Sequence, residues 1–298
     1  MQKKRFDPSA AALIASMVIF GTVGIFRRYM DLPSSVVALG RGAVGSVFLL
    51  VLLLVQGRKP KGLKRNAPVL FLSGAMIGFN WIFLFEAYNY TTVATATLCY
   101  YMAPVFVIML SPLVLREKWT LKKGVCILLA LCGMVLVSGV MKTGFGAGDM
   151  KGVLLGLGAA ALYAAVILLN KRITGMEAVE KTAVQITSAT VVLLPYVLLT
   201  EDVGALAFTR SSLALLVGMG IVHTGLAYVL YFGSLRKVSA HTAAIFSYID
   251  PVVAVCLSAL LLREPMGLEG VMGTVLILGA ALYGEWPEKE GGKGNEQA

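Results

Sequence analysis

The chain has 298 residues, of which 58% are hydrophobic and 14% are charged, and its mean hydropathy is +0.81. Soluble domains average about 45–50% apolar and about 25% charged residues, so a soluble fold could not cover this much apolar surface. The formal net charge of +10 would suit a nucleic-acid partner. The basic residues, however, are scattered through short connections and form no basic domain or arm. We therefore expect an all-α integral membrane protein with the lipid bilayer, and no nucleic acid, as its partner.

Apolar runs near the ~20 residues that a helix needs to cross the hydrocarbon recur along the chain. The first run follows the basic residues Lys3, Lys4 and Arg5. It is too long for a signal peptide and has no small-residue cleavage site after it, so we interpret it as a helix. The runs predict ten transmembrane helices, at residues 9–29, 34–55, 66–88, 92–114, 121–140, 150–170, 180–200, 212–234, 239–262 and 267–285.

Ten spans would put both termini on the same side of the membrane. Most of the 26 Lys and Arg residues fall in the termini and connections of that side. Cytoplasmic loops carry an excess of Lys and Arg. We therefore expect a multi-pass protein of a bacterial cytoplasmic (inner) membrane with both termini in the cytoplasm.

The chain also matches itself at a shift of 147 residues, which superimposes Pro104 on Pro251. Residues 95–117 and 242–264 align at this shift without a gap, and both segments end in Arg-Glu. Other identical residues could arise by chance between two apolar helices, so the evidence rests on the proline and Arg-Glu matches. The pattern predicts an internal repeat.

The equivalent points of this repeat are separated by five helices, which is an odd number. The second copy must therefore enter the membrane upside down. We expect a first five-helix repeat at residues 1–145, a second, inverted repeat at 146–286 and a disordered cytoplasmic tail at 287–298. Inverted repeats are typical of secondary transporters, which bind substrate near the midplane between the copies.

With Arg41 in the second span, the Pro104 and Pro251 helices and the Arg-Glu pairs that close them, the chain resembles the drug/metabolite transporter superfamily. Within it, the chain is similar to EamA-like ten-helix transporters over nearly its whole length. The resemblance implies a 5+5 inverted fold and a central cavity lined by helices 1–4 and 6–9, with helices 5 and 10 peripheral. It identifies the substrate poorly, since the superfamily exports amino acids, nucleosides, drugs and other metabolites.

Two prolines are candidates for helix breaks at the substrate site. Pro104 lacks the N–H that would bond the carbonyl of Tyr100, and Pro251 does the same to Ser247, so each frees a backbone acceptor inside a span. Free polar backbone at this depth needs a cavity or a partner. The alternative is a packing kink whose carbonyl is satisfied by a neighbouring hydroxyl.

Ionisable residues inside the spans are costly, so they should face the interior of the bundle or stay neutral. Glu86 and Asp250 are candidates for proton coupling, although Glu86 lies close enough to a helix end to contact water instead. His223 and His241 could titrate during transport. Arg41 could bind a substrate carboxylate or neutralise an acid, and a structural ion pair is the alternative.

Aromatic residues gather in the same spans, and an aromatic, weakly polar cavity would suit amphipathic organic solutes. An aromatic belt or simple helix packing would explain them equally well. With Arg41, the candidates for substrate contact are Trp81, Phe85, Tyr88, Tyr100, Tyr101, Tyr228 and Tyr248.

The sequence thus predicts a secondary active transporter that exports an amino acid or a similar small-molecule substrate by alternating access. There is no Walker phosphate loop to bind ATP. The four cysteines lie in apolar runs without CxxC spacing, so we expect no metal and no cofactor. The alternatives are an uncoupled facilitator or channel of the same fold, a membrane-embedded enzyme, for which clustered catalytic groups are missing, and a non-transporting scaffold. We expect no enzyme activity, and a monomer or homodimer.

Overall fold

The structure is a computed structural model that describes residues 8–58, 60–115, 120–137, 147–235, 237–238, 246–264 and 266–285. Within these ranges every regular element is a helix and none is a strand. This agrees with a lipid environment, because hydrocarbon offers the backbone no hydrogen-bond partners and a helix pairs its own N–H and C=O groups.

The first half of the described chain contains seven helical segments. They are α1 (Pro8–Gly21), α2 (Val23–Arg28), α3 (Ser34–Val55), α4 (Leu63–Tyr90), α5 (Val93–Tyr100), α6 (Ala103–Leu115) and α7 (Leu121–Val137). The second half contains α9 (Ala147–Asn170), α10 (Ala178–Thr200), the short 3₁₀ turn η1 (Val203–Ala205), α11 (Arg210–Gly218), the π-helix η2 (Met219–Leu226), α12 (Ala227–Leu235), α14 (Ile249–Leu261) and α15 (Leu268–Glu285).

Seven of the helical stretches in the described residues are long and apolar enough to cross a membrane, and two further apolar helices are shorter. The prediction of an all-helical, multi-pass membrane protein is thus confirmed. The long stretches are residues 8–28, 34–55, 63–90, 93–110, 149–170, 178–200 and 210–234, and the shorter ones are 249–261 and 268–283.

Several helices are interrupted inside the bundle. The first span divides at Thr22, and the fourth divides at Tyr101 and Met102, immediately before Pro104. A new helix, α14, likewise begins at Ile249, two residues before Pro251. Both prolines therefore lie in the first turn of a helix, where a missing N–H leaves no intrahelical bond unmade. The sequence predicted these two breaks.

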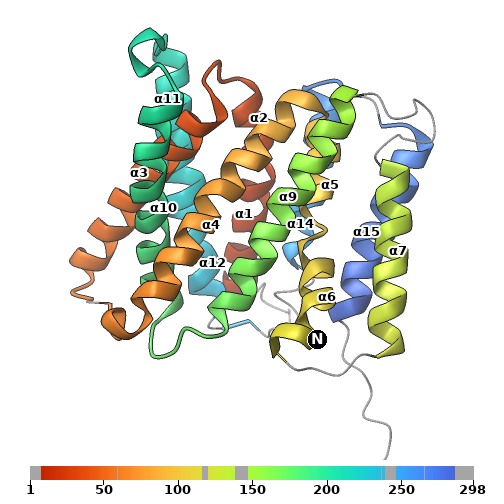
Figure 1. The fold of residues 1–298 in the computed structure, drawn as a ribbon, viewed down its shortest axis with the longest axis horizontal. Coiled ribbons are helices and arrows are strands. Elements are labelled where there is room, and N and C mark those ends of the chain that lie inside the picture. The colour runs from red at the N-terminus through yellow and green to blue at the C-terminus, as the bar shows by residue number, and fades with distance from the viewer. Residues whose placement is uncertain are drawn as a thin grey trace, which may run out of the picture.

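Figure 1 shows the bundle with α4 and α9 side by side near its centre and with α7 and α15 paired at one edge. Helix α1 packs against α12 and α14, α9 packs against α4, α5 and α6, and α3 packs against α10. We call the end of the bundle where α2 passes into α3 the α2–α3 end, at the top of Figure 1, and the opposite end the α3–α4 end.

Glycines allow the closest helix contacts, as is usual in lipid, where packing of small residues replaces the hydrophobic effect. Gly74 faces the backbone of Gln185 on α10, and Gly156 faces Cys99 on α5. Helices α7 and α15 meet through Gly133 and Gly273. A Cβ on Gly133 would lie 2.7 Å from the carbonyl oxygen of Gly273, and a Cβ on Gly273 would lie 2.5 Å from that of Gly133.

We predict that Gly133→Ala weakens the protein by about 1–3 kcal/mol, the usual cost of overpacking, because the new methyl group meets backbone that cannot move aside. The measurement is the Tm of the detergent-solubilised protein. Gly124→Ala is the matched control, since it lies on the same helix and its Cβ would meet no atom within 4 Å. Equal Tm values for the two variants would contradict the predicted contact.

Candidate functional site

A cavity of about 430 Å³ lies inside the bundle. Its described lining comes from α1 to α6, α9, α12, α14 and the segment leading into α14, and none of it comes from α7, α10 or α15. The lining runs from Tyr88, near the α2–α3 end of α4, to Ile167 and Tyr231, near the α3–α4 ends of α9 and α12, so the cavity occupies much of the depth of the bundle.

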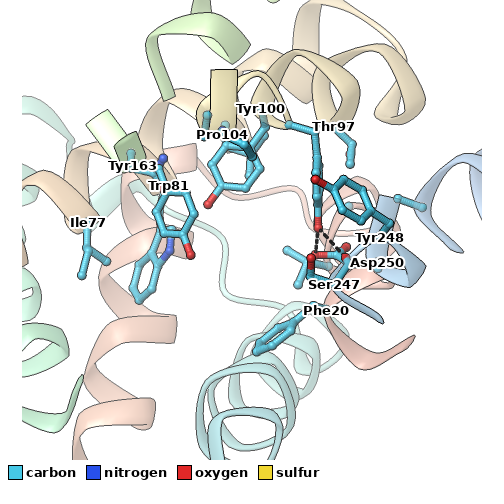
Figure 2. Close-up of a pocket in the computed structure, with 18 of the residues that line it drawn as sticks. Phe20, Ile77, Trp81, Thr97, Tyr100, Pro104, Tyr163, Ser247, Tyr248 and Asp250 are labelled. Carbon is cyan, nitrogen blue, oxygen red and sulfur yellow. Dashed lines mark hydrogen bonds between the residues drawn. The ribbon is translucent and has the colours of Figure 1, made fainter. Parts of the chain in front are cut away.

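Aromatic side chains form most of the cavity wall. Phe20 contacts Tyr228, with 5.4 Å between ring centroids, and Tyr100 contacts Tyr163 at the same centroid distance. Figure 2 shows Tyr100 beside Pro104 on one side and Phe20 on the opposite side. The aromatic lining residues are Phe20, Trp81, Tyr88, Tyr100, Tyr101, Tyr163, Tyr228, Tyr231 and Tyr248. The wall therefore offers apolar ring faces together with many hydroxyl groups.

Arg41 lines the cavity from α3 and is only 5% exposed. Its Nε donates a hydrogen bond to Thr224 Oγ1 at 2.9 Å. The guanidinium carbon lies 4.5 Å from the centroid of the Trp81 ring and 5.7 Å from that of Phe85. In the described chain no carboxylate forms an ion pair with it. A cation held only by rings and a hydroxyl keeps its charge available for another partner.

The π-helix η2 supplies the partner of Arg41. π-helical turns are rare and occur frequently at functional sites. Thr224 lies in η2 next to His223, whose side chain is fully buried. The hydroxyl of Thr22 donates to the carbonyl of Ile19, so at 2.8 Å the Nε2 of His223 acts as the donor to Thr22. His223 thereby connects η2 to the break between α1 and α2, behind the cavity wall.

Asp250 lies on the other side of the cavity. Tyr101 donates a hydrogen bond to Asp250 Oδ2 at 2.6 Å, and the same hydroxyl lies 3.4 Å from the carbonyl oxygen of Ser247. Figure 2 shows these bonds as dashed lines, with Asp250 far from Trp81 across the cavity. The carbonyl of Ser247, which lies just before the start of α14, therefore has a neighbouring hydroxyl, as in the alternative that the sequence left open.

Glu86 is placed elsewhere, in a polar network at the α2–α3 end. Ser34 donates to Glu86 Oε2 at 2.7 Å, and Asn89 donates to the same oxygen at 3.0 Å. Arg27, which is 5% exposed, donates to Ser34 Oγ and to Asn89 Oδ1. Glu86 is thus a hydrogen-bonded group at a helix end and does not line the cavity.

Glu264 joins three segments at the same end of the bundle. One carboxylate oxygen pairs with Arg28 Nη2 at 3.0 Å, and the other accepts from the backbone N–H of Val93 at 2.9 Å and from the hydroxyl of Ser258. Arg28 also donates to the carbonyl of Tyr88. Glu264, the acid of the second Arg-Glu pair that the sequence singled out, therefore ties α2, α5 and α14 together.

Most sequence-predicted site residues come together at this one cavity. Those that line it are Arg41, Trp81, Tyr88, Tyr100, Tyr101, Tyr228, Tyr248, Asp250 and Pro104. Phe85 and His223 are fully buried behind the wall, and Glu86 and Pro251 are also outside the lining. His241, Arg116, Glu117 and the tail at 287–298 lie outside the described residues.

Sequence reasoning missed several lining residues, among them Phe20, Asn80, Tyr163 and Tyr231. Tyr163 and Asn80 are rare polar groups within apolar spans, and that signal could have identified them. Asn80 donates to the carbonyl of Ala159 at 2.6 Å and so joins α4 to α9. Among the described residues, no group of three or more His, Cys, Asp or Glu side chains could hold a metal ion.

Comparisons with known proteins agree with this membrane fold. The EamA-like transporter family matches residues 8–139 and 150–283. The uncharacterized transporter YxxF of Bacillus subtilis is 30% identical over 281 residues, covering 93% of this chain and 89% of its own. An uncharacterized transporter of Archaeoglobus fulgidus is 29% identical over 280 residues, covering 93% of this chain and 96% of its own.

A solved crystal structure shares the fold, with a TM-score of 0.66 and 18% sequence identity. The likeness covers 94% of this chain and 96% of that one. The family match extends over nearly the whole chain in two consecutive segments, and the named relatives are transporters. The chain therefore belongs to the EamA-like transporter family.

Proposed function

We propose that this protein is a secondary active transporter that exports an amino acid or a similar amphipathic metabolite by alternating access. The observation that carries the proposal is the cavity, whose described lining has an aromatic wall, one cationic residue and one acidic residue. Its size, about 430 Å³, lies within the ~300–1,000 Å³ range of small-molecule sites. No cofactor or enzymatic step enters the proposal.

The helix contacts support an inverted 5+5 arrangement, with the first repeat in residues 1–145 and the second in 146–286. When each broken helix is counted as one span, α1 and α9 are the first spans of the two repeats. The third span is α4 in the first repeat and α12 in the second, and the fourth span is α5 with α6 in the first repeat and α14 in the second. The first member of each repeat, α1 or α9, packs against the third and fourth members of the other repeat. The second members, α3 and α10, pack against each other, as do the fifth members, α7 and α15. An exchange of the two halves thus preserves the contacts.

The contacts at the two ends support a conformation that opens to one side. At the α2–α3 end, Glu264 holds α2, α5 and α14 together. The cavity lining is buried toward that end, where Tyr88 is 3% exposed, and is partly exposed toward the α3–α4 end, where Tyr163 is 38% exposed. The excess of Lys and Arg in the connections of that end favours a cytoplasmic location for it. We infer that this conformation faces the cytoplasm, and that both termini lie there, in the cytoplasmic membrane.

Asp250 is our candidate for proton coupling. Helices α1, α2 and α5 pack against α14. Among these neighbours α1 carries no ionisable side chain, and both cations of α2 are engaged elsewhere, Arg28 with Glu264 and Arg27 with Ser34 and Asn89. Tyr101 bonds Asp250 directly. An intramembrane carboxyl group without a cationic partner is suited to binding and releasing a proton.

A transport measurement tests the coupling. Radiolabelled amino acids and similar amphipathic metabolites that raise the Tm of the solubilised protein would be offered to proteoliposomes with and without an imposed pH gradient. We expect the gradient to drive accumulation in the wild type, and Asp250→Asn to reduce it at least tenfold, because the side chain can no longer bind the proton. Asp202→Asn, at an exposed loop position, is the matched control.

Accumulation that ignores the gradient and survives Asp250→Asn would contradict the coupling. Uptake that never exceeds the external concentration would instead indicate an uncoupled facilitator of the same fold.

Labelling with a membrane-impermeant maleimide tests the orientation. Lys61 lies between α3 and α4, and Asp202 lies between α10 and α11, so an inverted repeat places these exposed loops on opposite faces. In a background without the exposed Cys132 and Cys256, we expect Asp202→Cys to react on intact cells. Lys61→Cys should react only after lysis. Reaction of both on the same face would exclude the inverted arrangement.

A further inference from the structure

Arg41 is the one cationic side chain among the described residues that line the cavity. It is held from two directions, by Thr224 at Nε and by the faces of Trp81 and Phe85. Neither contact uses the two terminal amino groups of the guanidinium. Within the described chain the two amino groups have no hydrogen-bond acceptor. They are also absent from the fully buried polar atoms that lack a partner, so they remain accessible from the cavity. The free end of the guanidinium therefore faces the space that a solute would occupy.

A guanidinium in an apolar bundle needs an anion, because desolvation of an unpaired charge is expensive. The acid of the cavity does not supply it. Asp250 is bound by Tyr101 and lies on α14, away from Trp81, over which Arg41 is placed. The anion that complements Arg41 must therefore come with the substrate.

The contacts of the Arg41 guanidinium indicate which kind of anion would fit beside it. With Nε engaged by Thr224, the two remaining amino groups form a planar pair that matches the two oxygens of a carboxylate. One cation balances one negative charge, so a dianion such as a phosphate monoester would stay undercompensated. The ring of Trp81 beside Arg41, and the tyrosines beyond it, offer faces for an aromatic or apolar body.

We infer that the substrate is an organic monoanion with a carboxylate group on an aromatic or apolar body, and that Arg41 binds this carboxylate end-on. The inference rests on the proposed transport function and specifies its substrate class. The ammonium group of an α-amino acid would lie next to its carboxylate, on the Arg41 side of the cavity and far from Asp250. A carboxylate without that ammonium is therefore the better fit.

The test compares acids with their amides as ligands of the solubilised protein, through the rise in Tm with concentration. The probes are benzoate and benzamide, 3-phenylpropanoate and 3-phenylpropanamide, and phenylalanine and phenylalaninamide. We expect at least one of the first two acids to bind tenfold or more tightly than its amide, and 3-phenylpropanoate to bind more tightly than phenylalanine.

Variants then assign the preference to Arg41. Arg41→Gln should abolish the preference for the acid, and Arg41→Lys should keep a reduced preference, because it retains the charge and loses the planar fork. Thr224→Val, which removes the anchor of Nε, should weaken it in part. Arg65→Gln is the control, because Arg65 is an exposed arginine at the start of α4. A monodisperse elution profile and the Tm without ligand would identify any variant that fails to fold.

Equal binding of acids and amides, or no binding of the acids, would overturn the inference, as would an acid preference that survives Arg41→Gln. Tighter binding of phenylalanine would overturn the preference for a carboxylate without an ammonium group. The inference and the proposed transport function can be refuted by different results. Gradient-driven accumulation of a neutral or cationic solute would refute the monoanion and leave the transporter intact.

Discussion

Every backbone N–H and C=O group inside the hydrocarbon needs a partner within the protein, since lipid offers none. Most of this chain meets the requirement with continuous helices, in which each group pairs with the next turn. Among the described residues of the cavity-lining spans, the helices are interrupted at Thr22, at Tyr101 and Met102, at the π-helix η2 and before Pro251. All of them lie at or directly behind the cavity wall, where hydroxyl groups can reach the freed backbone.

The same constraint governs where polar side chains can lie. At the α2–α3 end, Glu86 and Glu264 accept hydrogen bonds from several donors each, and Arg28 pairs with Glu264. These side chains hold the ends of the helices together. Inside the cavity, by contrast, Arg41 and Asp250 each have one protein hydrogen-bond partner in the described chain and remain apart from each other. Arg41 and Asp250 are therefore the charged groups of the cavity that can still bind a solute, because helix packing does not use all of their hydrogen-bonding capacity.

Tyrosine suits a cavity wall in which some polar groups stabilise the helices and others stay available to a solute. A tyrosine contributes a ring that packs in an apolar bundle and a hydroxyl that can bond to a broken backbone or to a ligand. Tyr101 does both, because its ring contacts Tyr100 at 6.1 Å and its hydroxyl bonds Asp250. A wall of such residues can hold a solute without any covalent or metal chemistry.

Much of the fold was readable from the sequence, because lipid imposes a length and a hydropathy on each span and these are local properties. The helices expected at 34–55 and 180–200 agree with Ser34–Val55 and Ala178–Thr200 to within two residues. Helix breaks lie just before Pro104 and Pro251, since proline is favoured in the first turn of a helix. The aromatic and charged candidates were also recognisable, since such residues are rare inside spans.

Contacts between distant helices could not be read in this way. The sequence named both Glu86 and Asp250 as candidates for proton coupling and left water contact open for Glu86, yet only the packing of α2, α3 and α4 puts Glu86 in a network at the bundle end. It offered no means to separate Phe85, buried behind the wall, from Trp81 within it. It left Arg41 either paired or free, and this depended on Thr224 from another half of the chain. Composition and periodicity fix what each helix can do in lipid, whereas the direction in which its side chains point depends on neighbours far away in the sequence, 52 residues for Glu86 and Ser34 and 183 for Arg41 and Thr224.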